Sequence, residues 1–179
     1  MATKRIENQK VVLRWLQAHH TLLGNKSFSN FSKDFFYKNS YDFLLREGSF
    51  FSCQELNKEE KSHIKKIVGR LGFAPQMKEC FYNAQFLALS DSSNKIQYAE
   101  GYAYTDLMPI LHGFNVINGK VIDITWKNKK DDNKKNHAYY GVALPTQYVR
   151  KQMLDMSMAT SLIECYENKF DILKKKFEL

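Results

Sequence analysis

The chain has 179 residues, of which 44% are hydrophobic and 14% aromatic, and it carries a formal net charge of +8. This composition excludes a disordered chain, no stretch approaches the roughly 20 apolar residues of a membrane span, and the charged start lacks the apolar core of a secretory signal. We therefore expect one domain over residues 1–179, no membrane association and a cytoplasmic location.

The first predicted element is a helix that ends near Gly24. Apolar residues recur every three or four positions before it, as one face of a helix requires. These residues are Val12, Trp15, Leu16 and Leu23. His19 and His20 are adjacent and point in different directions on a helix, so we interpret them as structural or surface residues and not as a catalytic pair.

A second helix is predicted over Lys58–Leu71, after a stretch without clear periodicity in which only residues 41–45 favour a short helix. Asn57 and Glu60 have the spacing of a capping box at its start, and Gly72 is placed to end it.

A third helix is predicted from the apolar run that begins at Cys80, between Pro75 and the polar residues 90–94. Cys80 lies in its first turn, where unpaired backbone N–H groups and the positive end of the helix dipole favour a thiolate over a thiol. A buried structural cysteine gains nothing from such a position. The other two cysteines, Cys53 and Cys165, have no metal-ligand spacing, and we expect free thiols.

Residues 97–104 alternate as in a strand, with Ala99, Gly101 and Ala103 on one face and larger side chains on the other. A face of small residues lets a helix approach closely, so we expect the Cys80 helix to pack there.

Two β-rich runs joined by Asn118 and Gly119 predict a hairpin with a type I′ turn. The turn fixes the register and places Phe114 opposite Asp123. His112 and Asp123 therefore share a face as diagonal neighbours. Their Cα atoms are expected roughly 7–8 Å apart, close enough for a hydrogen bond between imidazole and carboxylate.

The last predicted strand covers residues 137–144, and the chain after Pro145 is predicted to be helical. Its apolar residues keep a helical spacing for several turns. They are Val149, Met153, Met156, Thr160, Ile163, Tyr166, Phe170, Leu173 and Phe177. We interpret the methionine-rich stripe as core packing, with a groove for a partner as the alternative.

These elements predict an α+β fold in which helices flank a central antiparallel sheet of about four strands. Residues 1–75 form an N-terminal helical part, 76–144 the core with the Cys80 helix and the sheet, and 145–179 a C-terminal helical segment.

The lysines cluster at residues 127–135 and 174–176. Neither cluster alternates with aromatic residues or belongs to a nucleic-acid-binding motif, so we interpret both as solvated charges. Binding of nucleic acid or another acidic partner remains the alternative use of the positive charge.

Cys80, His112 and Asp123 have the residue types of a catalytic triad. The cysteine is a potential nucleophile, the histidine can take its proton, and the aspartate can fix the tautomer of the imidazole. Two alternatives remain: the histidine and aspartate are an incidental polar pair on a sheet, or the three residues hold a metal ion. The position of Cys80 and the lack of a fourth ligand favour the triad over the metal site.

The order of these segments resembles the transglutaminase-like superfamily of the papain-like fold, over about the middle third of the chain. The matching segments are Gly101-Tyr102, His112-Gly113-Phe114 and Ile122-Asp123-Ile124-Thr125-Trp126. Here Gly113-Phe114 replaces the commoner Ala-Trp, and Ile124 replaces proline. The segment Glu79-Cys80-Phe81-Tyr82-Asn83-Ala84-Gln85 also resembles uncharacterised bacterial and phage proteins with the same order of segments.

The resemblance implies a papain- or transglutaminase-like core and acyl transfer through a thioester on Cys80. We expect no cofactor or metal, because the sequence has no evident acidic cluster for calcium. The substrate would be a protein or peptide amide. For an oxyanion hole, the candidates are the backbone N–H of Cys80 and the side chain of Gln76. Tyr102 and Asp106 are the candidates for lining the substrate cleft.

We therefore expect a cysteine-dependent hydrolase or acyltransferase, such as a deamidase, protease or transglutaminase-type enzyme. The alternative is a non-catalytic protein that binds nucleic acid or an acidic partner through a basic surface. The lysine- and asparagine-rich composition hints at a phage or bacterial source, so the cytoplasm concerned would be that of the bacterium or of a host cell.

Overall fold

The chain folds into helices around one five-stranded antiparallel sheet. The computed structural model describes residues 2–24, 34–72, 74–105, 107–126, 136–156 and 158–178. The elements are α1 (Ala2–Gly24), α2 (Ser40–Glu47), β1 (Ser49–Phe51), α3 (Lys58–Leu71), α4 (Cys80–Ser90), β2 (Gln97–Tyr104), β3 (Ile110–Ile117), β4 (Lys120–Ile122), β5 (Ala138–Leu144), α5 (Thr146–Asp155) and the 3-10 helix η3 (Asp171–Leu173). The mixed α and β class is confirmed, with five strands in place of about four.

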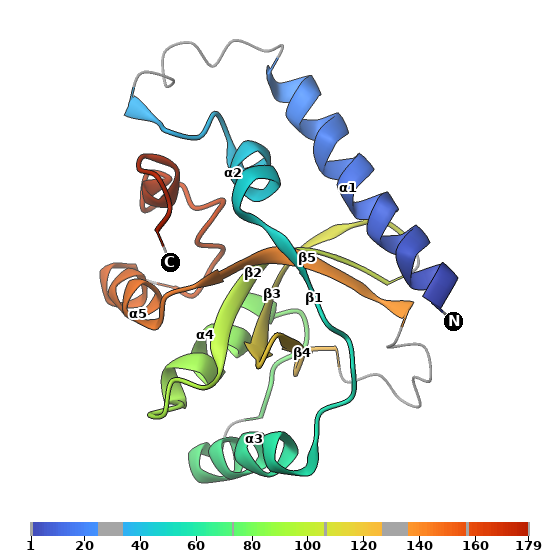
Figure 1. Cartoon of the computed structure of the whole chain (residues 1–179). Coiled ribbons are helices and arrows are strands. Elements are labelled where there is room, and N and C mark those ends of the chain that lie inside the picture. The colour runs from blue at the N-terminus through green and yellow to red at the C-terminus, as the bar shows by residue number, and fades with distance from the viewer. Residues whose placement is uncertain are drawn as a thin grey trace.

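The helices form largely where the sequence predicts them. α3 begins with the expected capping box, in which the backbone N–H of Glu60 donates to Asn57 Oδ1 and that of Asn57 donates to Glu60 Oε2, each over 2.8 Å. α1 begins at Ala2 and ends at Gly24, the residue predicted to end it. α1 and α2 lie beside β5, whereas α4 lies beside β3, with α3 next to it (Figure 1). None of the described helices is long and apolar enough to cross a membrane.

The sheet has the strand order β1-β5-β2-β3-β4, and it curls until its two edges meet. The extra strand, β1, pairs with β5. Just after β1, the backbone N–H of Ser52 donates to the carbonyl of Gly119 over 2.9 Å, and the N–H of Val121 donates to the carbonyl of Ser52 over 2.8 Å. These bonds join the β1 end of the sheet to β4, so one face of the sheet becomes the inside of the curl.

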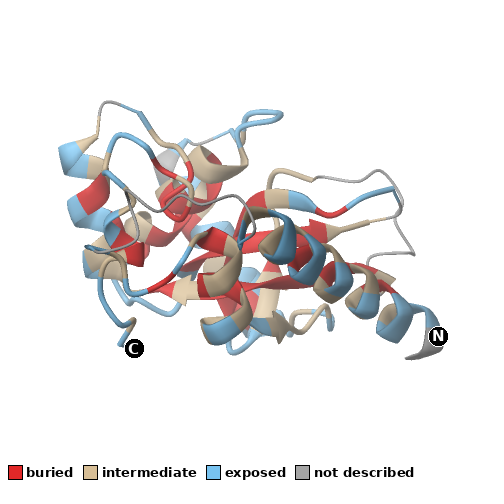
Figure 2. Cartoon of the chain, turned by 90° about the horizontal axis from the view of Figure 1, so that it is seen from above, coloured by how far each residue is buried: buried red, intermediate tan, exposed pale blue. Residues whose placement is uncertain are grey.

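Small residues cover much of that inner face. Ala99 and Ala103 are fully buried there with Phe114. Gly101 on β2 pairs with Gly141 on β5, and a Cβ on either glycine would collide with the backbone of the other strand. The small residues therefore permit the tight curl of the sheet. Many of the buried residues lie in its strands (Figure 2).

The Cys80 helix packs on the outer face instead, so the expectation that it covers the small residues was wrong. The amide of Asn115 donates to the carbonyl of Ala84 on α4 over 2.7 Å. Asn115 lies opposite Tyr98 on the outer face, and Gln85 of α4 contacts the Tyr98 hydroxyl. The close approach of helix and sheet occurs at Gly113, where a Cβ would lie 3.0 Å from the Cα of Phe81.

Replacing Gly113 by alanine is therefore expected to destabilise the protein by about 1–3 kcal/mol, as overpacking of a tight contact does. The added Cβ meets the backbone of α4, which cannot move aside as a flexible side chain would. Gly69, inside α3, has nothing within 4 Å of its missing Cβ and supplies the matched control. Gly69→Ala should stabilise by about 0.5–1 kcal/mol. Urea unfolding measures both; equal stability of Gly113→Ala and wild type would contradict the close approach.

The C-terminal segment departs most from its prediction, because α5 ends at Asp155 and no long helix follows. Its backbone is bound by a side chain: the carboxylate of Glu100, fully buried on β2, accepts from the N–H groups of Leu162 (2.8 Å) and Ile163 (3.2 Å). In a helix those N–H groups would bond to carbonyls four residues earlier. Ile163 and Leu173 therefore reach the core without a long helix, whereas Met158 and Tyr166 stay exposed.

Candidate active site

Cys80 is the first residue of α4, as predicted, and its side chain is partly exposed. The residue before it, Glu79, makes no side-chain hydrogen bond to cap the helix. The N–H groups of the first turn are therefore not satisfied by the cap and can stabilise a negative charge there. All three cysteines are unpaired, and burial raises the pKa of Cys53 to about 11.

The hairpin forms with the predicted register. Val116 lies opposite Val121, and Asn118 and Gly119 have the positive φ angles, 51° and 73°, of a type I′ turn. β4 ends one residue before Asp123, so this residue leaves the ladder that the hairpin begins. Its carboxylate still reaches the histidine of β3.

His112 Nε2 lies 2.8 Å from Asp123 Oδ2, and both side chains are buried. The Asp123 carboxylate also accepts from the Tyr139 hydroxyl (2.9 Å) and from the backbone N–H groups of Thr125 and Trp126 (3.0 Å each). Burial raises the pKa of Asp123, but these hydrogen bonds, led by that from His112, outweigh it and lower the pKa. The carboxylate is therefore ionised and held in one orientation.

His112 connects this carboxylate with Cys80. It is only 2% exposed, and its ring stacks on Trp126 with centroids 4.2 Å apart. Because Nε2 faces Asp123, Nδ1 is left for the hydrogen bond that His112 makes with the Cys80 side chain. Burial lowers the pKa of His112, but the hydrogen bonds with Asp123 and Cys80 outweigh it and raise the pKa to about 9. At neutral pH an imidazolium therefore lies between a carboxylate and the cysteine sulfur.

The raised pKa makes the stability of the protein depend on pH. A histidine with a pKa of about 9 when folded and 6.5 when unfolded stabilises the fold fully below about pH 6.5, and this contribution is lost as the pH rises through about 9. We expect the free energy of unfolding to fall by about 3 kcal/mol over that window. Urea unfolding between about pH 6 and 9.5 measures it. The decline should be absent in His112→Gln; an equal decline in that variant would assign it to another group.

Asn83, one turn after Cys80, ties three parts of the site together. It is fully buried, and its side-chain amide makes two hydrogen bonds with the backbone of Gln76. It accepts from the Gln76 N–H (3.0 Å) and donates to the Gln76 carbonyl (2.7 Å). The same amide also donates to Thr125 Oγ1 over 2.9 Å. The role of Asn83 was not predicted from sequence, although its spacing of three from Cys80 places both residues near one side of the helix.

The structure brings together four of the six candidate residues. Gln76 lies just before α4 with its backbone fixed by Asn83 and its side chain exposed. Tyr102 is not part of this group: Gly101 pairs with His112, so the next side chain points to the other face, where its hydroxyl contacts Tyr41 over 3.2 Å. Asp106 lies outside the described residues.

Two features of the chain bear on the metal-site and basic-surface alternatives. No group of three or more histidine, cysteine, aspartate or glutamate side chains is arranged there so that it could hold a metal ion. The lysine cluster at residues 127–135 lies outside the described residues. No protein-family model, curated protein or solved structure matches this chain. The geometry of the site is therefore the basis for assigning a function.

Proposed function

We propose that this protein is a cysteine-dependent hydrolase or acyltransferase that acts on an amide of a protein or peptide. The observation that carries the proposal is the buried His112, which hydrogen-bonds with Asp123 on one side and with Cys80 on the other. An incidental polar pair on a sheet would have no reason to meet the one cysteine that begins a helix. A binding protein would not need the three groups in this order.

The reaction would proceed in two steps. The Cys80 thiolate attacks the amide carbonyl carbon, the new C–S bond forms, and His112 gives its proton to the departing amine as the C–N bond breaks. Water or a second amine then attacks the thioester, with neutral His112 taking the proton and the Cys80 thiolate leaving. The negative oxygen of each tetrahedral intermediate would be bound by the Cys80 N–H and by Gln76.

A transglutaminase-like, papain-like core is the fold that we propose for this chemistry. A cysteine at the start of a helix, packed beside an antiparallel sheet that carries the histidine and is followed by the aspartate, supports that relation. The unpaired cysteines fit the reducing cytoplasm of a bacterium or host cell.

Acylation by a p-nitrophenyl ester tests the proposal. The wild type should release p-nitrophenol in a burst of one equivalent per chain, and peptide mapping should place the acyl group on Cys80. Cys80→Ala should show no burst, whereas Cys53→Ala, which removes a cysteine outside the site, should retain it. Glutamine-containing peptides, followed by ammonia release and by mass spectrometry, then distinguish deamidation and transamidation from peptide hydrolysis.

Acylation of the wild type at Cys53 and Cys80 alike, or an unchanged burst in Cys80→Ala, would contradict a catalytic cysteine. A binding role for the basic surface would then become the working hypothesis.

A further inference from the structure

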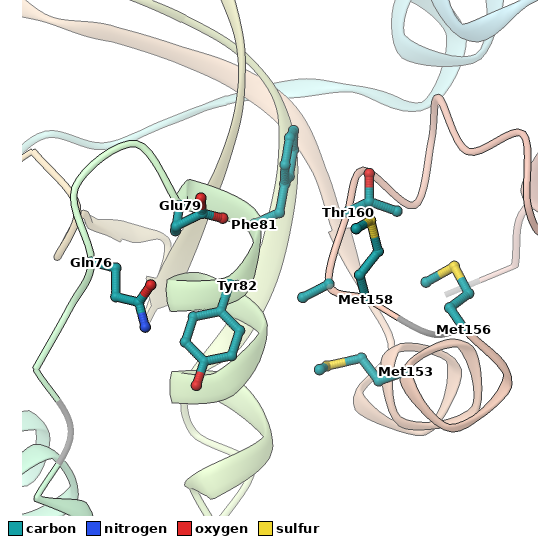
Figure 3. A pocket seen from close by; sticks show the side chains of 9 residues that line it. Gln76, Glu79, Phe81, Tyr82, Met153, Met156, Met158 and Thr160 are labelled. Atoms are coloured by element: carbon teal, nitrogen blue, oxygen red, sulfur yellow. The ribbon is translucent and has the colours of Figure 1, made fainter.

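A groove of about 590 Å³ lies at the start of α4. It is lined by Gln76, Glu79, Phe81, Tyr82, Met153, Met156, Met158, Ala159 and Thr160. Figure 3 shows two walls: Phe81 and Tyr82 on the side of α4, with the three methionines across from them. Its volume lies within the range of pockets that bind small ligands or parts of larger ones.

Cys80 itself does not line the groove, but its sequence neighbours do. Glu79 and Phe81, the neighbours of Cys80 on either side, both line it, and so does Gln76, the candidate oxyanion donor. A carbonyl attacked by Cys80 with its oxygen directed at Gln76 would therefore lie at the edge of the groove. The group next to that carbonyl would enter it.

The lining favours an apolar group. Met153 comes from α5 and Met156 and Met158 from the segment after it, so the wall opposite α4 consists largely of thioether side chains. Met158 is 63% exposed. Methionine is unbranched and flexible, and it adapts to apolar side chains of different shapes.

One charge accompanies this apolar surface. Among the described residues, Glu79 is the only charged side chain in the lining, and it has no ion-pair partner. In a chain with a net charge of +8, an unpaired carboxylate at the substrate groove favours a cation at that position.

Buried polar anchors hold the methionine wall in place. Gln85 of α4 donates to the carbonyl of Thr160 over 2.7 Å, and Glu100 accepts from the hydroxyl of Ser161 and the N–H of Leu162. Both anchoring side chains are fully buried. The wall is therefore positioned by the folded core and does not depend on a ligand to form.

From these contacts we infer that the groove binds a bulky apolar residue next to the scissile amide, with a basic residue beside it at Glu79. This inference rests on the proposed function and names its substrate: a protein or peptide segment that pairs an apolar residue with a lysine or arginine. A simple acyl chain would contact the methionine wall but would make no ionic interaction with Glu79.

Covalent dipeptide probes test this, since binding of the peptide part in the groove speeds their reaction with Cys80. Chloromethyl ketones of acetyl-Lys-Leu, acetyl-Glu-Leu and acetyl-Gly-Gly place the peptide on the acyl side, and iodoacetyl-Leu-Lys, iodoacetyl-Leu-Glu and iodoacetyl-Gly-Gly amides place it on the leaving side. In at least one series the leucine–lysine probe should label Cys80 at least about tenfold faster than the glycine probe, after normalisation to free cysteine. It should also exceed the leucine–glutamate probe about fivefold.

Variants separate the two parts of the groove. Met153→Gln with Met158→Gln keeps side-chain length but removes apolar surface, and it should abolish the leucine preference. Glu79→Gln should abolish only the preference for lysine over glutamate. Leu154→Gln is the matched control, because Leu154 is 81% exposed on the same helix and does not line the groove. It should leave both preferences unchanged.

Each other result overturns the inference. If plain iodoacetamide labels Cys80 rapidly in a His112-dependent way but no probe shows a leucine preference, the groove does not bind substrate and the proposed function stands. If N-hexyl iodoacetamide matches the leucine probes and lysine gives no advantage, the occupant is an acyl chain and not a peptide. If Cys80 reacts slowly with iodoacetamide and independently of His112, the proposed function fails, and the inference fails with it.

Discussion

Alkylation of Cys80 by iodoacetamide should slow about 10- to 30-fold at near-neutral pH when His112 is replaced by alanine, because a cysteine of ordinary pKa, about 8.5, is only about 3% thiolate at pH 7, whereas a neighbouring cation brings this fraction closer to one. His112 has a pKa of about 9 and is protonated under these conditions. Its hydrogen bond with Cys80 therefore joins an imidazolium to the sulfur and favours the reactive thiolate. Mass spectrometry of each cysteine-containing peptide over a series of times and pH values measures the rates.

The chain supplies its own controls for this experiment. His63 also faces a buried carboxylate, with Nε2 3.1 Å from Asp91 Oδ2, but that pair is not part of the Cys80 site. His63→Ala should leave the alkylation rate unchanged. Cys53 should react slowly in every variant, because burial raises its pKa to about 11. If Cys80 reacted no faster than Cys53, or kept its rate in His112→Ala, His112 would not activate Cys80 in solution.

The contact of His112 with Asp123 could be predicted from sequence because it is local. Asn118 and Gly119 specify a turn of two residues, and such a turn fixes which residues of the two strands share a face. The predicted contact forms although β4 ends before Asp123. After the strand pairing ends, the backbone N–H groups of Thr125 and Trp126 donate to the Asp123 carboxylate and hold it in place.

The position of the Cys80 helix on the sheet could not be predicted in the same way. Small residues such as Ala99 and Gly101 permit either a close helix or a tightly curled sheet, and the sequence around them does not distinguish the two. The choice depends on the contact of Ser52 with β4, between segments about 70 residues apart. The short strand β1 precedes Ser52, and its sequence has no periodicity from which this contact could be predicted.

The C-terminal segment shows how tertiary contacts override a helical pattern. Its apolar stripe reaches the core only in part, since Ile163 and Leu173 are buried but Tyr166 is 82% exposed. The spacing indicates some of the residues that reach the core, whereas the backbone conformation of the segment depends on Glu100, about 60 residues earlier. The carboxylate of Glu100 accepts hydrogen bonds from the backbone N–H groups of Leu162 and Ile163. Periodicity carries no information about such a distant partner.

Replacing Asp123 by asparagine should lower the rate of acyl transfer by about 10³- to 10⁴-fold while the protein remains folded, as loss of the orienting carboxylate does in other triads. The asparagine NH₂ group would take the place of the oxygen that faces His112, and it can only donate a hydrogen bond. Nε2 would then have to accept, which leaves the proton on Nδ1, the nitrogen that must receive the proton of Cys80. Loss of the negative charge would also lower the pKa of His112 from about 9.

Tyr139→Phe is the matched control for this variant. It removes one hydrogen bond, of 2.9 Å, to the same carboxylate but keeps the charge and the tautomer. Its loss of rate should therefore be no more than about tenfold, the equivalent of one neutral hydrogen bond. Burst kinetics of ester acylation give the rates, and NMR titration of the imidazole gives the pKa of His112. Equal losses in the two variants would mean that Asp123 anchors the loop after β4 and does not set the proton of His112; a wild-type rate in Asp123→Asn would remove it from the triad.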